Sequence, residues 1–226
     1  CGNGSTSAAV AGAIQTESKA TVEGVQVNLS GQTQKSFATG VNGLFVFNNL
    51  AAGADYTVTP SLNKGFLNGV STFDLVLISK HILGVQPLNT PYKLIAADVN
   101  NSKSVTTLDL IQLRKLILNI DATFANNSSW RFVDASYTFP NASNPWAASF
   151  PEVKNVNDLV GSLSANFVAV KVGDVNGNAI ANSTQGSVRN LTSNLGINVA
   201  DMNLVAGNEY KVDFTAADLN GIEGFQ

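Results

Sequence analysis

The chain has 226 residues, of which 44% are hydrophobic and only 13% are charged, and its formal net charge is −3. This length allows one large domain or two to three small ones, with enough apolar material for packed cores. The sequence shows no basic run, which argues against a nucleic-acid partner, and no apolar stretch of the roughly 20 residues that a membrane span needs. Because Asn, Ser, Thr and Gly must supply the polar surface, we expect a secreted or cell-surface protein.

Both ends of the chain suggest that it is a fragment. Residues 1–8 are small and polar and predict a linker. Cys1 is the only cysteine, so it is a lipid-modified N-terminus, half of a bridge to a missing domain, or a cloning remnant. We favour the bridge, because the other end, residues 221–226, also stops abruptly inside an apolar, strand-like run.

Residues 9–61 contain short apolar runs with a period of two, separated by Asn, Gly and Ser. Such alternation predicts the strands of a small β-sandwich. The clearest runs are VEGVQVNL (22–29), GLFVF (43–47) and YTVTP (56–60).

An internal repeat follows. Residues 69–83 match residues 104–118 at an offset of 35, with seven identical pairs that include Asp74 and Asp109. Each copy places apolar residues at helical spacing after small hydroxyl residues suited to a helix cap. Gly84 and Asn119 follow the copies, where a left-handed cap residue belongs. The repeat therefore predicts two short helices that pack on each other.

The remaining segments predict little regular structure. Residues 120–172 are rich in aromatics and turn formers, which indicates loops with a few strands, and residues 181–194 are polar and linker-like. Alternation returns in 195–226, which favours the strands of an incomplete sandwich. The predicted fold class is therefore α+β and multidomain: a β-sandwich, a duplicated helical module over 62–180 with a loop-rich insertion, and a final β-segment.

One loop of the repeat has the spacing of a calcium site. With Asp98 as position 1, oxygen-bearing residues follow at positions 3, 5, 7, 9 and 12, as in EF-hand loops: Asn100, Ser102, Ser104, Thr106 and Asp109. A tight loop presents the first ligands, and the first turn of a helix brings in the carboxylate. Position 6 is Lys103 rather than Gly, and position 12 is Asp rather than Glu. The alternative is an Asx-rich turn that only caps a helix.

The first copy is less complete. Counting back from Asp74 places Asn63 at position 1, with Gly65 and Leu67 where oxygen ligands belong. An empty loop kept for packing is an equal alternative. A third segment, Asp174-Val-Asn176-Gly-Asn178, repeats the first half of a loop without a following helix. We therefore hypothesise that this half-loop supplies Asp174 to the incomplete site at Asp74; its alternative is a plain turn.

The pair of segments resembles a type I dockerin of the variant found in large surface proteins of Bacteroidetes. The residues that carry this resemblance are 68–83 and 97–110, with 129–135 and 171–177. Residues 22–60 look like a carboxypeptidase regulatory-like or Cna-B-type sandwich, and residues 195–226 look like the opening of a cohesin-like domain.

The dockerin resemblance implies calcium-dependent folding, secretion and docking to cohesin-like or neighbouring β-domains of the same or another chain, with a possible homo-oligomer. Dockerins contact partners through loop positions 10 and 11, which here are Thr72 with Phe73 and Thr107 with Leu108. Apolar residues at position 11 depart from the family's hydroxyl pair, which favours core positions for Phe73 and Leu108 and leaves the partner open.

No catalytic constellation is visible. His81 is the only histidine and lies on a predicted helix without a second ligand, so triad-type catalysis has little support and we expect no enzyme. The alternative function is a carbohydrate-binding accessory module of a secreted enzyme, in which Trp130 and Trp146 stack on a sugar. Aromatic residues in a loop-rich region more often fill a core.

Overall fold

The structure is a computed structural model that describes residues 7–182, 197–199, 203, 206–207 and 209–216. The chain divides into two units, Cys1–Gly186 and Ser187–Gln226. In the second unit, β10 (Ile197–Val199) pairs antiparallel with β11 (Phe214–Ala216). Most of the segment predicted to open a cohesin-like domain lies outside the described residues, as does Cys1.

The first unit contains two β-sheets. The five-stranded sheet has the order β4-β1-β9-β6, and β8 also pairs with β1. The four-stranded sheet has the order β3-β2-β5-β7. The strand bounds are β1 (Ser7–Thr16), β2 (Gln26–Gly31), β3 (Lys35–Ala38), β4 (Leu44–Ala51), β5 (Tyr56–Ser61), β6 (Trp130–Asp134), β7 (Lys154–Val156), β8 (Ser162–Ser164) and β9 (Phe167–Lys171).

The predicted period of two is visible in the burial of the strands. Along β4, Phe45 and Phe47 are buried while Leu44 and Val46 are exposed. Because successive side chains of a strand point to opposite faces, this alternation places one face of the sheet in the core. The core of the two sheets includes Ile14, Val27, Phe45, Tyr56, Trp130 and Phe167.

The sheets extend beyond the predicted sandwich of residues 9–61. Strand β1 pairs in parallel with β9 and β8, and β5 pairs antiparallel with β7. Both sheets therefore combine strands from before and after the helical repeat, so the predicted boundary between 61 and 62 divides shared sheets. The physical reason is that β1 and β5 would otherwise carry unpaired backbone edges. The predicted linkers are also shorter, because Ser7 and Ala8 belong to β1 and Ala181 is buried.

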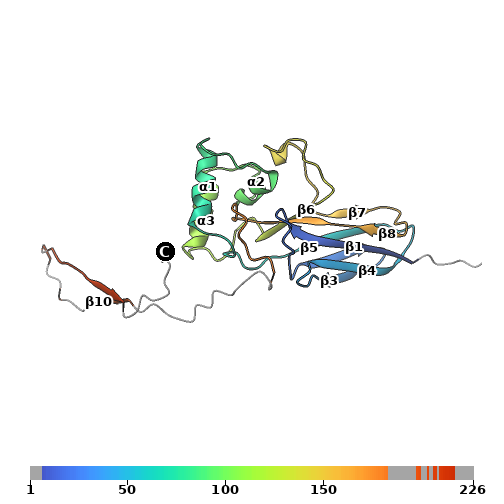
Figure 1. The fold of residues 1–226 in the computed structure, drawn as a ribbon, viewed down its shortest axis with the longest axis horizontal. Coiled ribbons are helices and arrows are strands. Elements are labelled where there is room, and N and C mark those ends of the chain that lie inside the picture. The colour runs from blue at the N-terminus through green and yellow to red at the C-terminus, as the bar shows by residue number, and fades with distance from the viewer. Residues whose placement is uncertain (1–6, 183–196, 200–202, 204–205, 208, 217–226) are drawn as a thin grey trace, which may run out of the picture. The chain divides into compact units, whose positions relative to one another are not determined.

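The three α-helices of the described residues lie beyond one end of the strands (Figure 1). Helix α1 (Thr72–Ile82) and helix α3 (Thr107–Ile117) start 107 − 72 = 35 residues apart, as the repeat predicts. Gly84 (φ 69°) and Asn119 (φ 55°) follow them in the left-handed conformation, which confirms the predicted helix ends. The short α2 (Pro91–Ala97) was not predicted. Mixed α+β content is thus confirmed.

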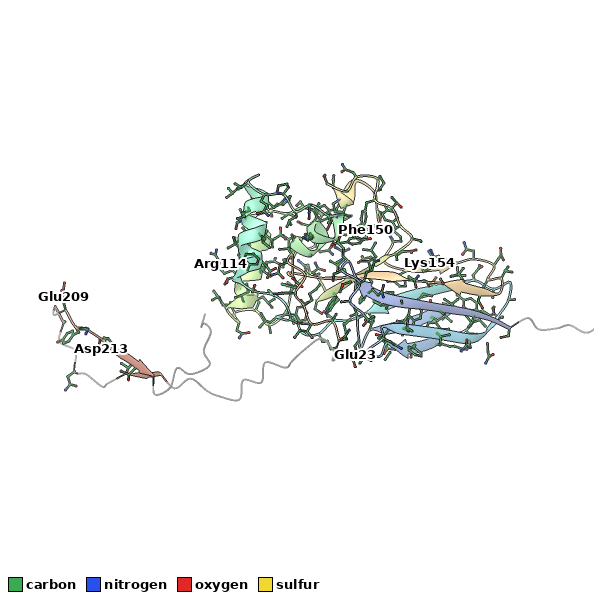
Figure 2. The ribbon with its side chains drawn as sticks, in the orientation of Figure 1. Glu23, Arg114, Phe150, Lys154, Glu209 and Asp213 are labelled. Atoms are coloured by element: carbon green, nitrogen blue, oxygen red, sulfur yellow. The ribbon has the colours of Figure 1, made fainter. Side chains whose placement is uncertain are left out.

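The helices have a core of their own, to which the three helices, the chain on both sides of β6 and the end of β9 contribute. It contains Ile78, Ile95, Leu113, Leu116, Phe124 and Val172. The loop after β6 carries a short 3₁₀ turn, η1 (Pro145–Ala147), and the aromatic ring of Phe150 labelled in Figure 2. None of the helices in the described residues is long and apolar enough to cross a membrane.

Candidate metal centre

Asp98 stands at the head of a tight loop that directly follows α2. Its side chain is fully buried, and both carboxylate oxygens accept hydrogen bonds from the backbone of the same loop. Ser102 N donates to Asp98 Oδ1 at 2.8 Å, and Lys103 N donates to Oδ2 at 2.9 Å. Lys103 has φ 65°, which is the left-handed conformation that a glycine usually provides at this point of an EF-hand loop. The loop therefore closes around Asp98 despite the missing glycine.

Asp109 on α3 completes this loop from the other side. It is also fully buried. Its Oδ1 accepts from Asn100 N at 3.1 Å, and its Oδ2 accepts from Thr106 N at 2.8 Å. The Asn100 Oδ1 atom accepts from Ser102 N at 3.0 Å, and Ser102 Oγ lies 3.2 Å from Ser104 O. The predicted ligands of the second copy thus gather in one contiguous loop.

Asp174 heads a second loop with the same internal bonds. Asp174 Oδ1 accepts from Gly177 N at 2.7 Å and from Asn178 N at 3.3 Å, and Oδ2 accepts from Ala179 N at 2.8 Å. Asn176 Oδ1 accepts from Asn178 N at 3.0 Å, just as Asn100 Oδ1 accepts from Ser102 N. No helix follows this loop along the chain.

The carboxylate that completes the second loop comes from α1. Asp74 Oδ1 accepts from Val175 N at 3.0 Å and from Asn176 N at 3.3 Å, although Val175 lies 101 residues away in sequence. Asp74 Oδ2 accepts from Ser71 N at 2.9 Å, the counterpart of the bond between Thr106 and Asp109. We call the segments 69–74 and 174–178 together the split loop. The structure thus places Asp174 beside Asp74, as our hypothesis requires.

Neighbouring residues hold the two halves of the split loop together. Asn68 Nδ2 donates to Ile180 O at 2.8 Å, and Ile180 N donates to Asn68 Oδ1 at 3.0 Å. Gly69 has φ 74°, and a Cβ atom there would lie 2.6 Å from Ala179 Cα. Only a glycine permits this close approach of the two segments.

Asn63, predicted at position 1 of the first copy, lies elsewhere. Its Oδ1 accepts from Ser129 N at 2.9 Å, and thus ties the start of the helical segment to β6. Asn63 was selected by counting back along the chain from Asp74. Such counting cannot find a residue that lies about 100 positions away in sequence and reaches the loop only in the folded structure. The repeated letters Asp-Val-Asn at 98–100 and 174–176 were the only signal for the split loop.

Burial dominates the electrostatics of both loop heads. Burial raises the pKa of Asp98, and the negative charge of Asp109 raises it further. The hydrogen bonds from the backbone N–H groups of Ser102 and Lys103 lower this pKa but do not cancel the effect of burial. Burial likewise raises the pKa of Asp174, with Asp74 adding to the effect. Two carboxylates thus face each other in each loop, away from water, and a cation between them would relieve both costs.

Two basic side chains approach the loops and were not anticipated from the sequence. Arg131 donates to Asn101 Oδ1 at 3.0 Å, but its main partner is Glu152, with bonds of 2.9 and 2.8 Å. Lys171 is buried, and this burial lowers its pKa to about 8, while Asp174 and Asp74 oppose the shift. Its ammonium donates to the backbone oxygens of Phe66 (2.9 Å) and Val172 (3.0 Å) rather than to a carboxylate. The sequence signal that could have revealed Lys171 is its position as a charged residue in the otherwise apolar strand 167–172.

The donor set of both loops suits a hard cation. Each loop gathers two carboxylates with amide, hydroxyl and backbone oxygens, which are the ligands that calcium takes. Among the described residues there is no group of three or more His, Cys, Asp and Glu side chains that could hold a metal ion. The residues present therefore fit calcium, with only two formal negative charges per loop.

The predicted partner-binding residues lie on the surface of the helix pair. Phe73 is 55% exposed and Leu108 is 59% exposed, so the preference for core positions was wrong. Thr72 and Thr107 beside them are exposed as well. These residues stand in the first turns of α1 and α3, directly before the buried carboxylates Asp74 and Asp109.

The two tryptophans do not form the exposed pair that the carbohydrate-binding alternative requires. Trp130 is 4% exposed and belongs to the core of the sheets. Trp146 is half-buried in η1. His81 accepts a bond from Leu88 N at 3.2 Å, and burial lowers its pKa, so this histidine has a structural role.

Comparisons of the chain with protein-family models, with curated proteins and with solved structures find no match. The interpretation of the two loops therefore depends on their own geometry.

Proposed function

We propose that the first unit is a calcium-stabilised structural and interaction module of a secreted protein. Calcium would bind in the contiguous loop and in the split loop, and the helix pair would dock a β-domain. The observation that carries this proposal is the shared hydrogen-bond pattern of the two loops. In both loops, the carboxylate at position 1 accepts from the backbone N–H at position 5, and the carboxylate at position 12 accepts from those at positions 3 and 9. In the split loop, positions 1, 3, 5, 9 and 12 are Asp174, Asn176, Asn178, Ser71 and Asp74. The same pattern thus occurs in one continuous loop and in one that joins distant segments.

This shared pattern favours a common ligand over simple helix capping. A cap needs one carboxylate at the start of the helix, and Asp74 and Asp109 already serve α1 and α3 in this way. Capping does not account for Asp98 and Asp174, which add a second buried carboxylate to each loop. A buried pair of like charges is costly unless a cation compensates it. Calcium provides that compensation.

The helix pair supports the docking part of the proposal. Four exposed apolar residues on or just beyond α1 recur 35 residues later on or just beyond α3. Soluble proteins rarely keep such apolar surfaces without a partner. We call these residues the repeated apolar face; its pairs are Phe73 with Leu108, Val76 with Ile111, Leu83 with Leu118, and Val85 with Ile120.

The resemblance to type I dockerins supports a cohesin-like β-domain as the occupant of this face. The same resemblance favours an extracellular location and a non-enzymatic role. A second copy of the chain is the other occupant to test, because a repeated face can pair with itself.

The calcium part is tested by thermal melts in excess calcium and in chelator. Saturating calcium at about 100 times its Kd would stabilise the fold by about 2.7 kcal/mol per site, or roughly 5–10 °C for a unit of this size. The double variant Asp98→Ala with Asp109→Ala should lose much of this shift. Equal melting temperatures of the wild-type protein in calcium and in chelator would contradict the calcium part of the proposal.

The split loop is tested by the number of calcium ions bound, measured by titration calorimetry. We expect two ions for the wild-type protein and one for Asp174→Asn, because this isosteric change removes one of two charges. Asn63→Ala should still bind two, since Asn63 bonds to Ser129. The exposed Asp121→Asn is the matched control. Two ions bound by Asp174→Asn would show that the split loop is no calcium site.

The docking part is tested with a panel of immobilised cohesin-like domains and by sedimentation of the chain alone. Phe73→Ser with Leu108→Ser should abolish binding and leave the calcium melting shift unchanged, because both side chains are exposed and the change adds no charge beside Asp74 and Asp109. Val160→Ser, at an 84% exposed apolar position outside the helix pair, is the control. Equal binding by the double variant, or no partner together with a monomeric chain, would remove docking from the proposed function.

A further inference from the structure

Lys171 places a buried positive charge beside the split loop. It is 5% exposed and stands at the end of β9, three residues before Asp174. Its ammonium donates to Phe66 O at 2.9 Å and to Val172 O at 3.0 Å, and Asp174 N donates to the backbone oxygen of Lys171 at 3.3 Å. These bonds hold the ammonium inside the protein, next to the loop that Asp174 begins.

No salt bridge cancels the charge of Lys171. Among the residues that the structure describes, no carboxylate forms a salt bridge with it. Lys171 and Asp174 nevertheless line the same cavity of about 670 Å³. Burial lowers the pKa of Lys171 to about 8, while the charges of Asp174 and Asp74 oppose this shift. The ammonium is therefore protonated at neutral pH, and the two carboxylates of the split loop interact with its charge.

Arg131 is the corresponding positive charge at the contiguous loop, but it has its own counter-ion. Its Nη1 donates to Asn101 Oδ1 at 3.0 Å. Its Nε and Nη2 bond to the two carboxylate oxygens of Glu152 at 2.9 and 2.8 Å, and its Cζ lies 5.2 Å from the centre of the Phe150 ring. Because this bidentate contact joins two opposite charges, the pair as a whole is neutral. Arg131 therefore adds little net charge near Asp98.

The two loops thus differ in the charge that a cation would meet. The contiguous loop keeps the two negative charges of Asp98 and Asp109, whereas Lys171 cancels one of the two negative charges of the split loop. Lys103 also belongs to the contiguous loop, but its side chain is exposed, so water and salt screen its charge. Calcium affinity depends on the number of charged ligands in a site. The same dependence applies to a buried charge of the opposite sign beside them.

We propose that Lys171 makes the split loop the weaker of two calcium sites, so that calcium fills the contiguous loop first. The second ion would then bind only at a higher calcium concentration than the first. In the metal-free protein, Lys171 would act as the counter-ion of Asp74 and Asp174. The inference rests on the proposed function, because both loops must bind calcium. It adds to that function an order of filling and the residue that sets it.

The test measures the calcium affinity of each loop alone, by titration calorimetry at about pH 7. Asp174→Asn leaves the contiguous loop as the site, and Asp98→Asn leaves the split loop. We expect the contiguous loop to bind calcium at least about tenfold more tightly, because one charge at close range shifts an equilibrium by roughly one to three powers of ten. Equal affinities of the two loops would overturn the proposal.

Two further variants should change the affinities in opposite directions. Lys171→Met should tighten calcium binding to the split loop at least about tenfold and leave the contiguous loop unchanged. Glu152→Gln should weaken only the contiguous loop, because it removes the counter-ion of Arg131. The Glu152 side chain is 41% exposed, so this variant still tests the charge argument if loss of the Lys171 hydrogen bonds unfolds the first variant. Unchanged affinity of the altered loop in either folded variant would overturn the proposal.

Lys115→Met is the matched control. It makes the same chemical change at an exposed lysine of α3, where solvent screens the charge, and should change neither affinity by more than about twofold. A gain in split-loop affinity equal to that of Lys171→Met would show that only the overall charge matters, and would overturn the role of Lys171.

The number of ions separates this proposal from the function of the loops. Two ions whose affinities do not depend on Lys171 would overturn this proposal alone. One ion bound by the wild-type protein and two by Lys171→Met would support the role of Lys171 and overturn the proposed two-ion function. A wild-type protein that binds no calcium would overturn both.

Discussion

Asp98 and Asp174 are buried acids in loops that offer them backbone N–H groups, and no described residue forms a salt bridge with either. Their raised pKa values mean that the folded, metal-free protein holds protons which the unfolded chain has released. The stability of the metal-free protein should therefore fall as the pH rises above about 4 and through these raised values. In the proposed calcium sites, protons and calcium would compete for the same carboxylate oxygens.

This competition predicts how calcium stabilisation depends on pH. The difference between melting temperatures in calcium and in chelator should be largest near pH 7 and should shrink steadily as the pH falls. Both causes act in this direction: calcium loses affinity, and the metal-free protein gains stability. Melts at several pH values between about 4.5 and 7.5 measure it. A difference that is constant over this range would contradict the buried carboxylates as the calcium ligands.

Asp134 gives a contrast within the same molecule. Its burial raises the pKa, but the hydrogen bond and charge of Lys154, at 2.9 Å, together with Ser136, outweigh the burial and lower it. A lowered pKa stabilises the fold above the ordinary value and is lost only as the pH falls below it. The ordinary value is 3.8, so Asp134 does not disturb the window used for the loops.

At the scale of residues, the sequence predicted which side chains of the contiguous loop lie together. Asp98, Asn100, Ser102 and Asp109 can be read directly from the letters because they belong to one continuous loop. Their role as calcium ligands stays a prediction. The split loop was accessible only as a hypothesis, and Asn63 was a poor choice, because counting along the chain assumes continuity. The exposure of Phe73 and Leu108 was also missed, since an apolar side chain at a helix start suits a core or a partner equally.

At the scale of elements, β1 is the central strand of the five-stranded sheet. It pairs with β4 on one side and with β8 and β9 on the other. Gly12 lies in its middle, where a Cβ atom would stand 2.1 Å from Ala165 O and 2.6 Å from the ring of Phe45. The close approach of β1 to the chain at 165 therefore requires the absence of a side chain.

Gly12→Ala should destabilise the first unit by about 1–3 kcal/mol, because the added methyl group meets backbone that cannot move freely. Gly40→Ala is the matched control: its Cβ atom would approach only the Asn42 side chain, at 3.8 Å. That change should stay within about 0.5 kcal/mol. Urea unfolding measures both. Equal stabilities of the two variants would show that the β1 contact yields easily.

Helices and strands were not equally predictable. The two repeated helices were correct because apolar spacing, caps and left-handed end residues all agree. Helix α2 has seven residues, the last four of them buried, and so shows no amphipathic period. The strands after residue 129 were partly expected, but their partners were not, because alternation defines the faces of a strand and not its neighbours.

The whole first unit has one continuous sandwich core that draws on both ends of its sequence. Val10, Val27 and Tyr56 share it with Phe132, Phe167 and Val156. The local signals of residues 9–61 suggested an independent domain, since nothing in a single sequence reports which later strands will complete its sheets.

A fragment of residues 7–61 should therefore fail to fold. It would expose the edges of β1 and β5 and lose the core residues that come from later strands, among them Trp130, Phe132, Val156 and Phe167. We expect circular dichroism to show no cooperative melt for this fragment, whereas residues 7–182 should melt in one transition. A cooperative melt of 7–61 with dispersed amide resonances would establish that the predicted boundary at 61 is a real domain boundary.

The split loop has a consequence for the order in which a growing chain can fold. Asp74 leaves the ribosome about 100 residues before its partners at 175 and 176. At about 5–20 residues per second this is a delay of roughly 5–20 s. The contiguous loop needs no such wait, because Asp98 and Asp109 emerge together. Synthesis therefore sets a fixed sequence, in which the contiguous loop and the cap of α3 can form early, while α1 and the sandwich close only when the last strand has been made.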